Sequence, residues 1–489
     1  MGANYGWSLV EQERKREIIA AIATGVGGSA GDGAPTGPTH AEIDLTDRCN
    51  VACYFCNQQD VRTTQQLPLD KVFSLLDELV AGGLRSVRLS GGGDPLAHRE
   101  VGKVLARLTA LGVNVDNVNT NGALLTAELG RLLIENRCRE LIVSLNAVDA
   151  ADYHRMMQVK PATFDQVLDN VRRLVGQRGE LPLPVVTVQF LIDRENFRRI
   201  PEMYALGRSL GAERITISPV QDIPLQRIDH DILLAPADGE LVMPYFAAAL
   251  AADRDANLLS LFGPFPAWNQ AIEAIRSRAA QPQPQPAAAG APPAPAPTTP
   301  APAAANIAAA FKERNGGCFF GWYSATIRGN GDLYPCCLLM NPGYQPLGNA
   351  LATPTFKEQW QGKGFTLLRA EMREVLLRGG RVFFKPGRFK TLTRQCVEPN
   401  ACFLKNMYFR HDEEFYRDLD VALEAARKRE VRWLGSPRQV FRAAEVLAYR
   451  CYHGTRVRYD RGRRYLAARW TRLRPGRQRG GGQVSAGRS

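Results

Sequence analysis

Long apolar runs, a secretory signal and paired histidines are all missing from this sequence. No apolar stretch among its 489 residues reaches the roughly eighteen residues that a membrane-spanning helix needs. Near the N-terminus, Glu11, Glu13, Lys15 and Glu17 interrupt any apolar region of a signal peptide. We therefore expect a cytoplasmic protein that neither spans a membrane nor is secreted.

Acidic residues are scarce in one part of the chain only. The sequence has 62 Lys and Arg against 49 Asp and Glu, a net charge of +13. Residues 431–489 contain fifteen Arg, no Lys and only two acids, so this tail carries all of the excess. Arginine interleaved with aromatic residues suits nucleic acid, and a basic helix suits an anionic membrane surface. A solvated tail is the third alternative, and we expect no specific partner for it.

Histidine is also scarce, with six residues and no HExxH pair. Eight of the ten cysteines are grouped instead, and only Cys138 and Cys451 stand alone. The groups are Cys49, Cys53 and Cys56; Cys318, Cys336 and Cys337; and Cys396 and Cys402. In a reducing compartment, grouped thiols indicate metal or iron–sulfur binding rather than disulfides.

Short apolar runs alternate with amphipathic stretches between residues 40 and 220. The runs expected to be strands are 41–45, 86–89, 115–119, 141–145, 185–192 and 214–218. The stretches expected to be helices are 69–79, 101–111, 127–134, 164–175 and 200–210. This alternation predicts an α/β fold with a parallel sheet. Six units fall short of the eight of a closed barrel, so the prediction is a partial (β/α)6 barrel.

Composition divides the rest of the chain. The expected parts are an N-terminal helix and connector (1–39), the barrel core (40–235), a helical extension (236–280), a linker (281–305), a small α/β domain (311–410) and a helical basic tail (411–489). The linker has nine Pro among 25 residues, which predicts an extended, semi-rigid spacer. In the small domain, residues 324–334 predict a hairpin around the turn 329–332.

Two motifs follow the first two expected strands, at the sheet edge where parallel α/β proteins place their chemistry. Cys49, Cys53 and Cys56 form a CxxxCxxC pattern. Three thiolates can hold three irons of a [4Fe–4S] cube and leave the fourth iron open, whereas structural zinc prefers CxxC pairs and a fourth ligand. After the second strand comes a glycine-rich loop, 91–95, whose backbone can approach a ligand closely. A simple tight turn is the alternative for this loop.

Together these motifs resemble the radical S-adenosylmethionine (SAM) superfamily, with Asp94 in place of the usual Glu of its GGEP motif. The resemblance implies a [4Fe–4S] cluster with an open iron, SAM, and an electron donor such as flavodoxin or ferredoxin. The SAM contacts that it implies are Phe55, Gly92, Gly93, Asp94, Pro95, Ser144 and Asn146. It also implies reductive cleavage of SAM to a 5′-deoxyadenosyl radical. That radical would abstract hydrogen from a peptide or small-molecule substrate, for dehydrogenation, epimerisation or cross-linking. No catalytic side chain is assigned.

The C-terminal cysteines resemble a SPASM or twitch extension, in the segments around Cys318, Gly331–Cys337 and Trp360–Gly362. The resemblance implies an auxiliary [4Fe–4S] cluster held by Cys318, Cys336, Cys396 and Cys402, with Cys337 as a spare. A structural zinc on the same four is the alternative. Neighbours on a strand point to opposite faces. We expect Cys336 to face the cluster and Cys337 to face the core rather than the substrate cavity, where it could donate a hydrogen atom.

A rival function from another class is a zinc-stabilised nucleic-acid-binding protein that uses the Arg-rich tail as its binding surface. The two hypotheses differ in metal content. An anoxically purified iron–sulfur enzyme is brown, whereas the rival would be colourless and contain zinc.

Overall fold

The computed structural model describes both cysteine-bearing regions and the helices around them. The described residues are 10–25, 36–56, 58, 62–220, 230–251, 259–261, 268, 271–272, 274–275, 318–340, 344–352, 355–378, 390–392, 396 and 412–433. The expected linker at 281–305, Cys402 and the tail beyond residue 433 lie outside them. Within this described part, no helix combines the length and hydropathy that crossing a bilayer requires.

The core is a curved sheet of parallel strands. These are β1 (His40–Ile43), β2 (Ser86–Leu89), β3 (Asn114–Thr120), β4 (Glu140–Ser144), β5 (Val185–Ile192), β6 (Arg214–Pro219) and β7 (Leu259–Leu261). They lie in sequential order, and each pairs in parallel with the next. Parallel neighbours require crossovers, which the intervening helices supply. The core is therefore a partial α/β barrel, as expected.

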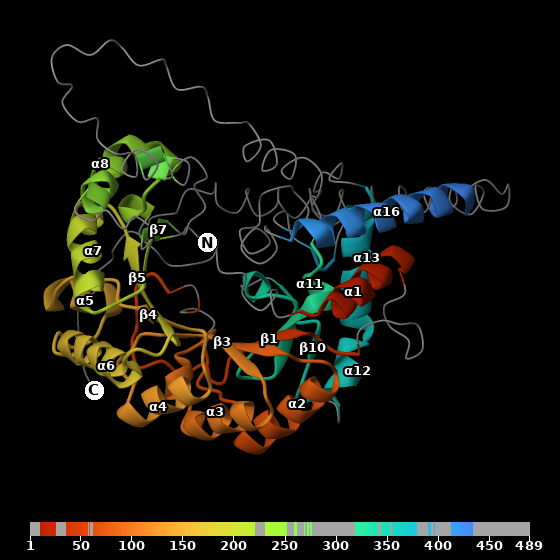
Figure 1. Cartoon of the computed structure of the whole chain (residues 1–489), viewed down its shortest axis with the longest axis horizontal. Helices are drawn as coiled ribbons and strands as arrows, with labels where there is room; N and C mark the ends of the chain where they lie inside the picture. Colours follow the sequence, from red (N-terminus) through yellow and green to blue (C-terminus); the bar gives the residue numbers. More distant parts are fainter. Residues whose placement is uncertain are drawn as a thin grey trace, which may run out of the picture. The chain divides into compact units, whose positions relative to one another are not determined.

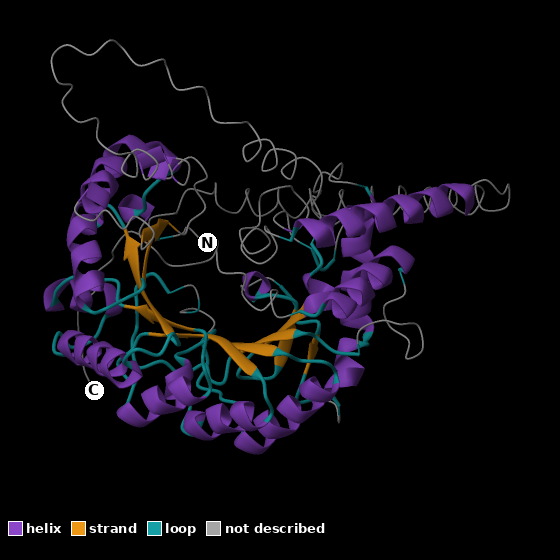
Figure 2. Cartoon of the chain, in the orientation of Figure 1, coloured by secondary structure: helices purple, strands orange, loops and turns teal. Residues whose placement is uncertain are grey.

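Helices cover the convex side of this sheet (Figures 1 and 2). They are α2 (Leu69–Ala81), α3 (Val101–Ala110), α4 (Ala127–Glu135), α5 (Ala150–Met157), α6 (Thr163–Arg178), α7 (Ile200–Ser209) and α8 (Gly239–Ala251). Helix α2 shows why they form: Val72, Leu75, Leu76 and Leu79 recur at helical spacing and are buried as one stripe. The stripe anchors the helix against the sheet.

The two faces of the sheet differ in polarity. Ala41 and Val87 are fully buried. Their neighbours Glu42 and Arg88 line a cavity. Successive side chains of a strand point to opposite faces, so the concave face carries the polar set. This alternation makes one side of the sheet a core and the other a wall of the site.

Two elements differ from the sequence-based expectation. Helix α5 was not predicted, because its polar residues leave only Tyr153, Met156 and Met157 buried. Strand β7 lies in the range 236–280 that was expected to be helical, so that expectation is wrong for residues 259–261. β7 pairs with β6, and a three-residue strand at a sheet edge has too short a pattern to be recognised.

The expected hairpin at 324–334 forms, but it extends the core sheet. Strands β8 (Ser324–Ile327) and β9 (Asp332–Tyr334) pair antiparallel, with Gly331 in the left-handed region at φ +85°. β8 also pairs in parallel with β1, in the register His40 to Ser324. The short strand β10 (Gly348–Asn349) completes this side of a ten-stranded sheet.

Four helices flank the hairpin side of the sheet: α1 (Gln12–Thr24), α11 (Phe320–Tyr323), α12 (Phe356–Trp360) and α13 (Lys363–Leu377). Arg373 of α13 donates hydrogen bonds to the carbonyls of Ile22 and Ala23 at the end of α1, at 2.8 and 3.0 Å. These hydrogen bonds join α1 to α13, although the contacting residues are 350 and 351 positions apart in the sequence.

By its contacts the chain divides into residues 1–423 and residues 424–489. The boundary falls within α16 (Glu413–Trp433). In the first unit, the ring of Phe415 lies 5.0 Å from that of Phe319, centroid to centroid. Of the second unit, only the C-terminal part of α16 is described.

Candidate active site

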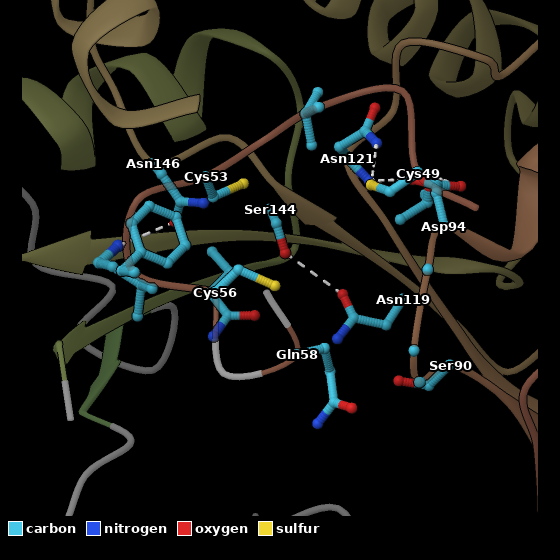
Figure 3. A pocket seen from close by; sticks show the side chains of 18 of the residues that line it. Cys49, Cys53, Cys56, Gln58, Ser90, Asp94, Asn119, Asn121, Ser144 and Asn146 are labelled. Carbon is cyan, nitrogen blue, oxygen red and sulfur yellow. Dashed lines mark hydrogen bonds between the residues drawn. The ribbon is translucent and has the colours of Figure 1, made fainter. Parts of the chain in front are cut away.

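A cavity of about 380 Å³ opens at the carboxyl ends of the core strands, within the size range of ligand pockets. Its walls come from the loops after β1, β2 and β3, from β4 and β5, and from the segment after β9. Figure 3 shows Cys53 beside Asn146, Cys49 beside Asn121, and Cys56 between these two sides. The three cysteines of the CxxxCxxC pattern therefore reach one cavity.

Each thiol of this group has a close neighbour. The guanidinium of Arg62 donates to Cys56 Sγ at 2.9 Å. Cys53 Sγ lies 3.5 Å from the sulfur of Met157. Burial is the main cause that raises the pKa of both Cys49 and Cys53, and the neighbouring thiols add to it. Such thiols stay protonated until a metal takes the proton's place.

A buried polar cluster holds the cysteine loop in position. The hydroxyl of Tyr54 donates to Asp193 Oδ2 at 2.5 Å, and the Arg155 guanidinium lies 3.0 Å from the same oxygen. Burial, and then the hydrogen bond to Asp193, raises the pKa of Tyr54. The loop after β1 is thereby tied to the end of β5 and to α5.

The glycine-rich loop after β2 packs against the segment between β1 and Cys49. Gly91 has φ +128°, and a Cβ on it would lie 1.4 Å from Asp44 Oδ1. A Cβ on Gly93 would lie 2.1 Å from the carbonyl oxygen of Arg48. Both distances are far below contact, so only glycine permits this approach. A simple turn would not require glycine at consecutive positions.

Asp94 connects two loops rather than presenting a free carboxylate. It accepts hydrogen bonds from the Leu96 and Asn121 amides at 2.9 and 2.8 Å and from Thr120 Oγ1 at 2.8 Å. Burial raises its pKa, and these three donors oppose that rise. The Asp therefore ties the loop after β2 to the loop after β3. Pro95 begins a short 3-10 helix and is absent from the described cavity lining.

The other expected cofactor-binding residues line the cavity. Phe55, Ser144 and Asn146 all do so. The Ser144 hydroxyl donates to Asn119 Oδ1 at 3.3 Å. Asn146 has φ +60°, and its side-chain oxygen accepts from the amide of Leu191 at 3.0 Å. Asn is among the residues that tolerate this left-handed geometry.

The cavity wall on the side of β1 and β2 is charged, and it includes Cys337. Arg88 and Glu42 form an ion pair at 3.9 Å. Burial, followed by the charge of Glu42, raises the pKa of Cys337. We expected Cys337 to face the core rather than the cavity; it packs against the core and also lines the cavity. The chain enters a 3-10 turn at Cys337, and this turn directs the segment 337–340 to the cavity.

The three other described cysteines of the C-terminal region, Cys318, Cys336 and Cys396, are absent from the described cavity lining. Cys336, Cys337 and Cys396 all pack against the small apolar cluster Tyr334, Leu339 and Met340. Cys318 is buried at the start of the region, and Cys402 lies outside the described residues. Cys337 also lines the cavity, whereas Cys336 and Cys396 are absent from its described lining.

Sequence reasoning missed the acidic and basic residues around the two loops. Asp44, Asp47 and Arg328 are almost fully buried beside the glycine-rich loop. The acidic residues next to the first apolar run could have indicated these functional positions, because the buried end of a strand seldom carries acids without a function. Gln58 is 3% exposed and also lines the cavity, and its side-chain oxygen accepts no hydrogen bond from the described residues.

The donor set suits a cluster better than a single ion. Among the described residues, no three His, Cys, Asp or Glu side chains surround one metal site. In a [4Fe–4S] cube each thiolate binds a separate iron, so the three sulfurs need only face a common space.

Comparison with known proteins agrees with this geometry. Residues 43–207 match the family model of the radical SAM superfamily, and residues 318–379 match that of an iron–sulfur cluster-binding domain, SPASM. Residues 43–207 therefore form a radical SAM domain. The C-terminal region is a SPASM-type auxiliary cluster domain, so the cofactors of the protein are SAM, a [4Fe–4S] cluster and auxiliary iron–sulfur.

Curated relatives cover part of the chain. A GTP 3′,8-cyclase of Marinobacter nauticus is 28% identical over 209 residues, 42% of this chain and 60% of that protein. The PqqA peptide cyclase of Gluconobacter oxydans is 29% identical over 189 residues, 38% of this chain and 51% of that protein. The chain thus matches about half to three fifths of these relatives' lengths.

Solved structures are similar at lower identity. The crystal structure of Streptococcus suis SuiB bound to S-adenosylmethionine has 16% identity and a TM-score of 0.48. That comparison covers 68% of this chain and 67% of SuiB.

Proposed function

We propose that this enzyme modifies a peptide by hydrogen abstraction, with dehydrogenation, epimerisation or cross-linking as the outcome. The proposal is carried by one observation: three cysteines, the glycine-rich loop and a polar strand face all line the same cavity. When bound, the reduced cluster and SAM supply a 5′-deoxyadenosyl radical that removes hydrogen from an unactivated carbon. The protein's own contribution is to bind, orient and shield.

The proposed cluster ligands are Cys49, Cys53 and Cys56. Gly92, Gly93 and the polar residues of β4 and its loop, Ser144 and Asn146, are the proposed SAM contacts. The proposal for Asp94 is a structural one, because its carboxylate already accepts three hydrogen bonds. Phe55, next to Cys56, is proposed to lie beside the adenine. Pro95 is proposed to shape the loop only.

The auxiliary cluster is proposed to use Cys318, Cys336, Cys396 and Cys402. Cys336 and Cys396 pack on one apolar cluster, which supports their pairing in one site, although Cys337 packs on the same cluster. Cys337 is excluded from this set, because its thiol lies on the cavity wall.

The substrate side of the cavity suits amides. Asn119, Gln189 and Ser218 offer both donors and acceptors on the concave strand face. A nucleoside triphosphate would need several cations to hold its phosphates. The described lining holds two arginines, of which Arg88 pairs with Glu42 and Arg62 donates to Cys56. The relative named PqqA peptide cyclase supports the same choice.

The test separates cofactor chemistry from substrate. Anoxically reconstituted enzyme, given SAM and dithionite, is expected to release 5′-deoxyadenosine without any peptide. Candidate peptides, deuterated at carbon, are then added one at a time, with GTP deuterated at carbon as the comparison substrate. Deuterium in 5′-deoxyadenosine with a peptide supports the proposal. Transfer from GTP and from none of the peptides would contradict it.

A further inference from the structure

Arg328 is a buried cation at the junction between the C-terminal hairpin and the cavity loops. It follows β8 directly and is 6% exposed. Its NH2 group lies 3.4 Å from Asp47 Oδ1, and its Nε lies 4.0 Å from Asp44 Oδ2. Both aspartates precede Cys49 in the chain and are 1% exposed. One guanidinium therefore serves two buried carboxylates that come from a distant segment.

The same two aspartates contact the glycine-rich loop. The Gly92 amide donates to Asp44 Oδ2 at 2.8 Å. A Cβ on Gly92 would lie 2.3 Å from Asp47 Oδ1 and 2.9 Å from the Arg328 NH2 group. Gly92 is thus packed directly on the ion cluster, with no space between them. Any movement of the aspartates would move the loop backbone.

The hairpin is fixed to this segment by its backbone as well. The amide of Asp44 donates to the carbonyl of Ile327 at 2.8 Å, which continues the β1–β8 pairing. Without Arg328, Asp44 and Asp47 would be two buried carboxylates beside each other with no cation between them. Removing one partner of a buried ion pair leaves the other charge buried without compensation. The segment that carries Asp44 and Asp47 would then have to shift towards water.

We propose that Arg328 is a positioning residue through which the iron–sulfur domain sets the affinity of the barrel for SAM. The guanidinium holds Asp44 and Asp47, and these hold Gly92 and its neighbours where SAM binds. Cys318 and Cys336 lie on either side of the hairpin, so the auxiliary-cluster segment and the SAM loop share one element. The inference concerns SAM alone and does not depend on the substrate proposed above.

The experiment compares Arg328→Met with Arg373→Met in reconstituted full-length enzyme. Arg373 also joins the C-terminal region to the N-terminal part, through the carbonyls of Ile22 and Ala23, and is absent from the cavity lining. Two quantities are measured: equilibrium SAM binding, and hydrogen exchange of peptides that cover residues 44–49 and 89–96.

Arg328→Met is expected to weaken SAM binding by roughly ten- to a hundredfold, the usual range of coupling between sites. It should also speed amide exchange in both peptides. Arg373→Met should leave both unchanged and speed exchange near residues 20–25 instead. Arg328→Lys should recover part of the affinity, because it restores charge without the planar fork.

Unchanged SAM binding in Arg328→Met would overturn the proposal, and so would an equal loss in Arg373→Met. If Arg328→Met fails to fold, the double variant Arg328→Met/Asp47→Asn removes one stranded charge. It should fold with wild-type iron content and still show fast exchange at 89–96 and weak SAM binding. Wild-type SAM affinity in that variant would equally refute the role of Arg328.

Discussion

The barrel core and the C-terminal hairpin contribute to one cavity in different ways. In the core, each strand pairs with the next strand in the sequence, and each loop brings its own motif to the same edge. The hairpin instead joins the sheet from far along the chain, where Ser324 pairs with His40. It adds a wall, with Cys337, and a buried cation, Arg328. The core therefore supplies the cofactor loops, and the hairpin supports and encloses them.

The difference between the barrel core and the hairpin region predicts that the two cysteine groups bind their iron–sulfur clusters independently of each other. Changing Cys49, Cys53 and Cys56 together to Ala should abolish release of 5′-deoxyadenosine. Iron should fall from about eight to about four per chain, because each cube contributes four. Iron analysis and chromatography of the SAM products measure both. Reductive SAM cleavage that survives the triple change would refute the assignment.

Within the hairpin region, the comparison separates Cys336 from Cys337. Cys336→Ser should lose about four irons per chain, and Cys337→Ser should lose none. Because the Cys337 thiol lies on the cavity wall, its variant should lower product formation while SAM cleavage without substrate persists. Iron loss in Cys337→Ser with full iron in Cys336→Ser would reverse the ligand assignment.

In the barrel, Asp94→Asn tests whether the carboxylate is structural. The amide side chain replaces one accepting oxygen by a donor that faces the amides and hydroxyl already donating to Asp94. A loss of about 1–3 kcal/mol in unfolding free energy is expected, together with weaker SAM binding. The control is Asp77→Asn, a half-exposed partner of Arg107, for which a change below about 1 kcal/mol is expected. Equal melting temperatures for Asp94→Asn and wild type would argue against the structural role.

The smallest effect on activity is expected near the amino ends of the strands, away from the cavity. Burial raises the pKa of Asp116 on β3 from its usual 3.8 to about 7. The folded protein therefore binds more protons than the unfolded chain between these values, and this group makes stability fall as pH rises through that window. His40 stays neutral beside it, because burial lowers its pKa to about 3.

Asp116→Asn removes that dependence. Between pH 4 and pH 7, the unfolding free energy of the variant should rise relative to that of wild type by up to about 1.4 kcal/mol per pH unit. SAM cleavage should be unchanged. Urea unfolding at several pH values measures the difference. A constant difference between the two proteins across this range would contradict the raised pKa.

Much of the barrel could be predicted from the sequence because its information is local. The strands β1 to β6 and most of the helices between them show their own periods, and β2 and β5 begin and end at the predicted residues. Cys49, Cys53 and Cys56 lie within eight residues, and the glycine-rich loop follows its strand directly. Loops at the carboxyl ends of neighbouring parallel strands must lie together. The convergence of these motifs on one cavity therefore followed from their order alone.

Only the tertiary structure shows which residues from other parts of the chain contact these motifs. No periodicity connects β8 to β1, because pairing between distant segments leaves no local pattern. The cavity-facing position of Cys337 depends on a 3-10 turn after β9, and the use of Asp94 depends on donors from the next loop. In the sequence, nothing distinguishes Arg328 from any other arginine that follows a strand. Its burial between Asp44 and Asp47 exists only once the hairpin has joined the sheet, since a buried charge needs partners that folding brings to it.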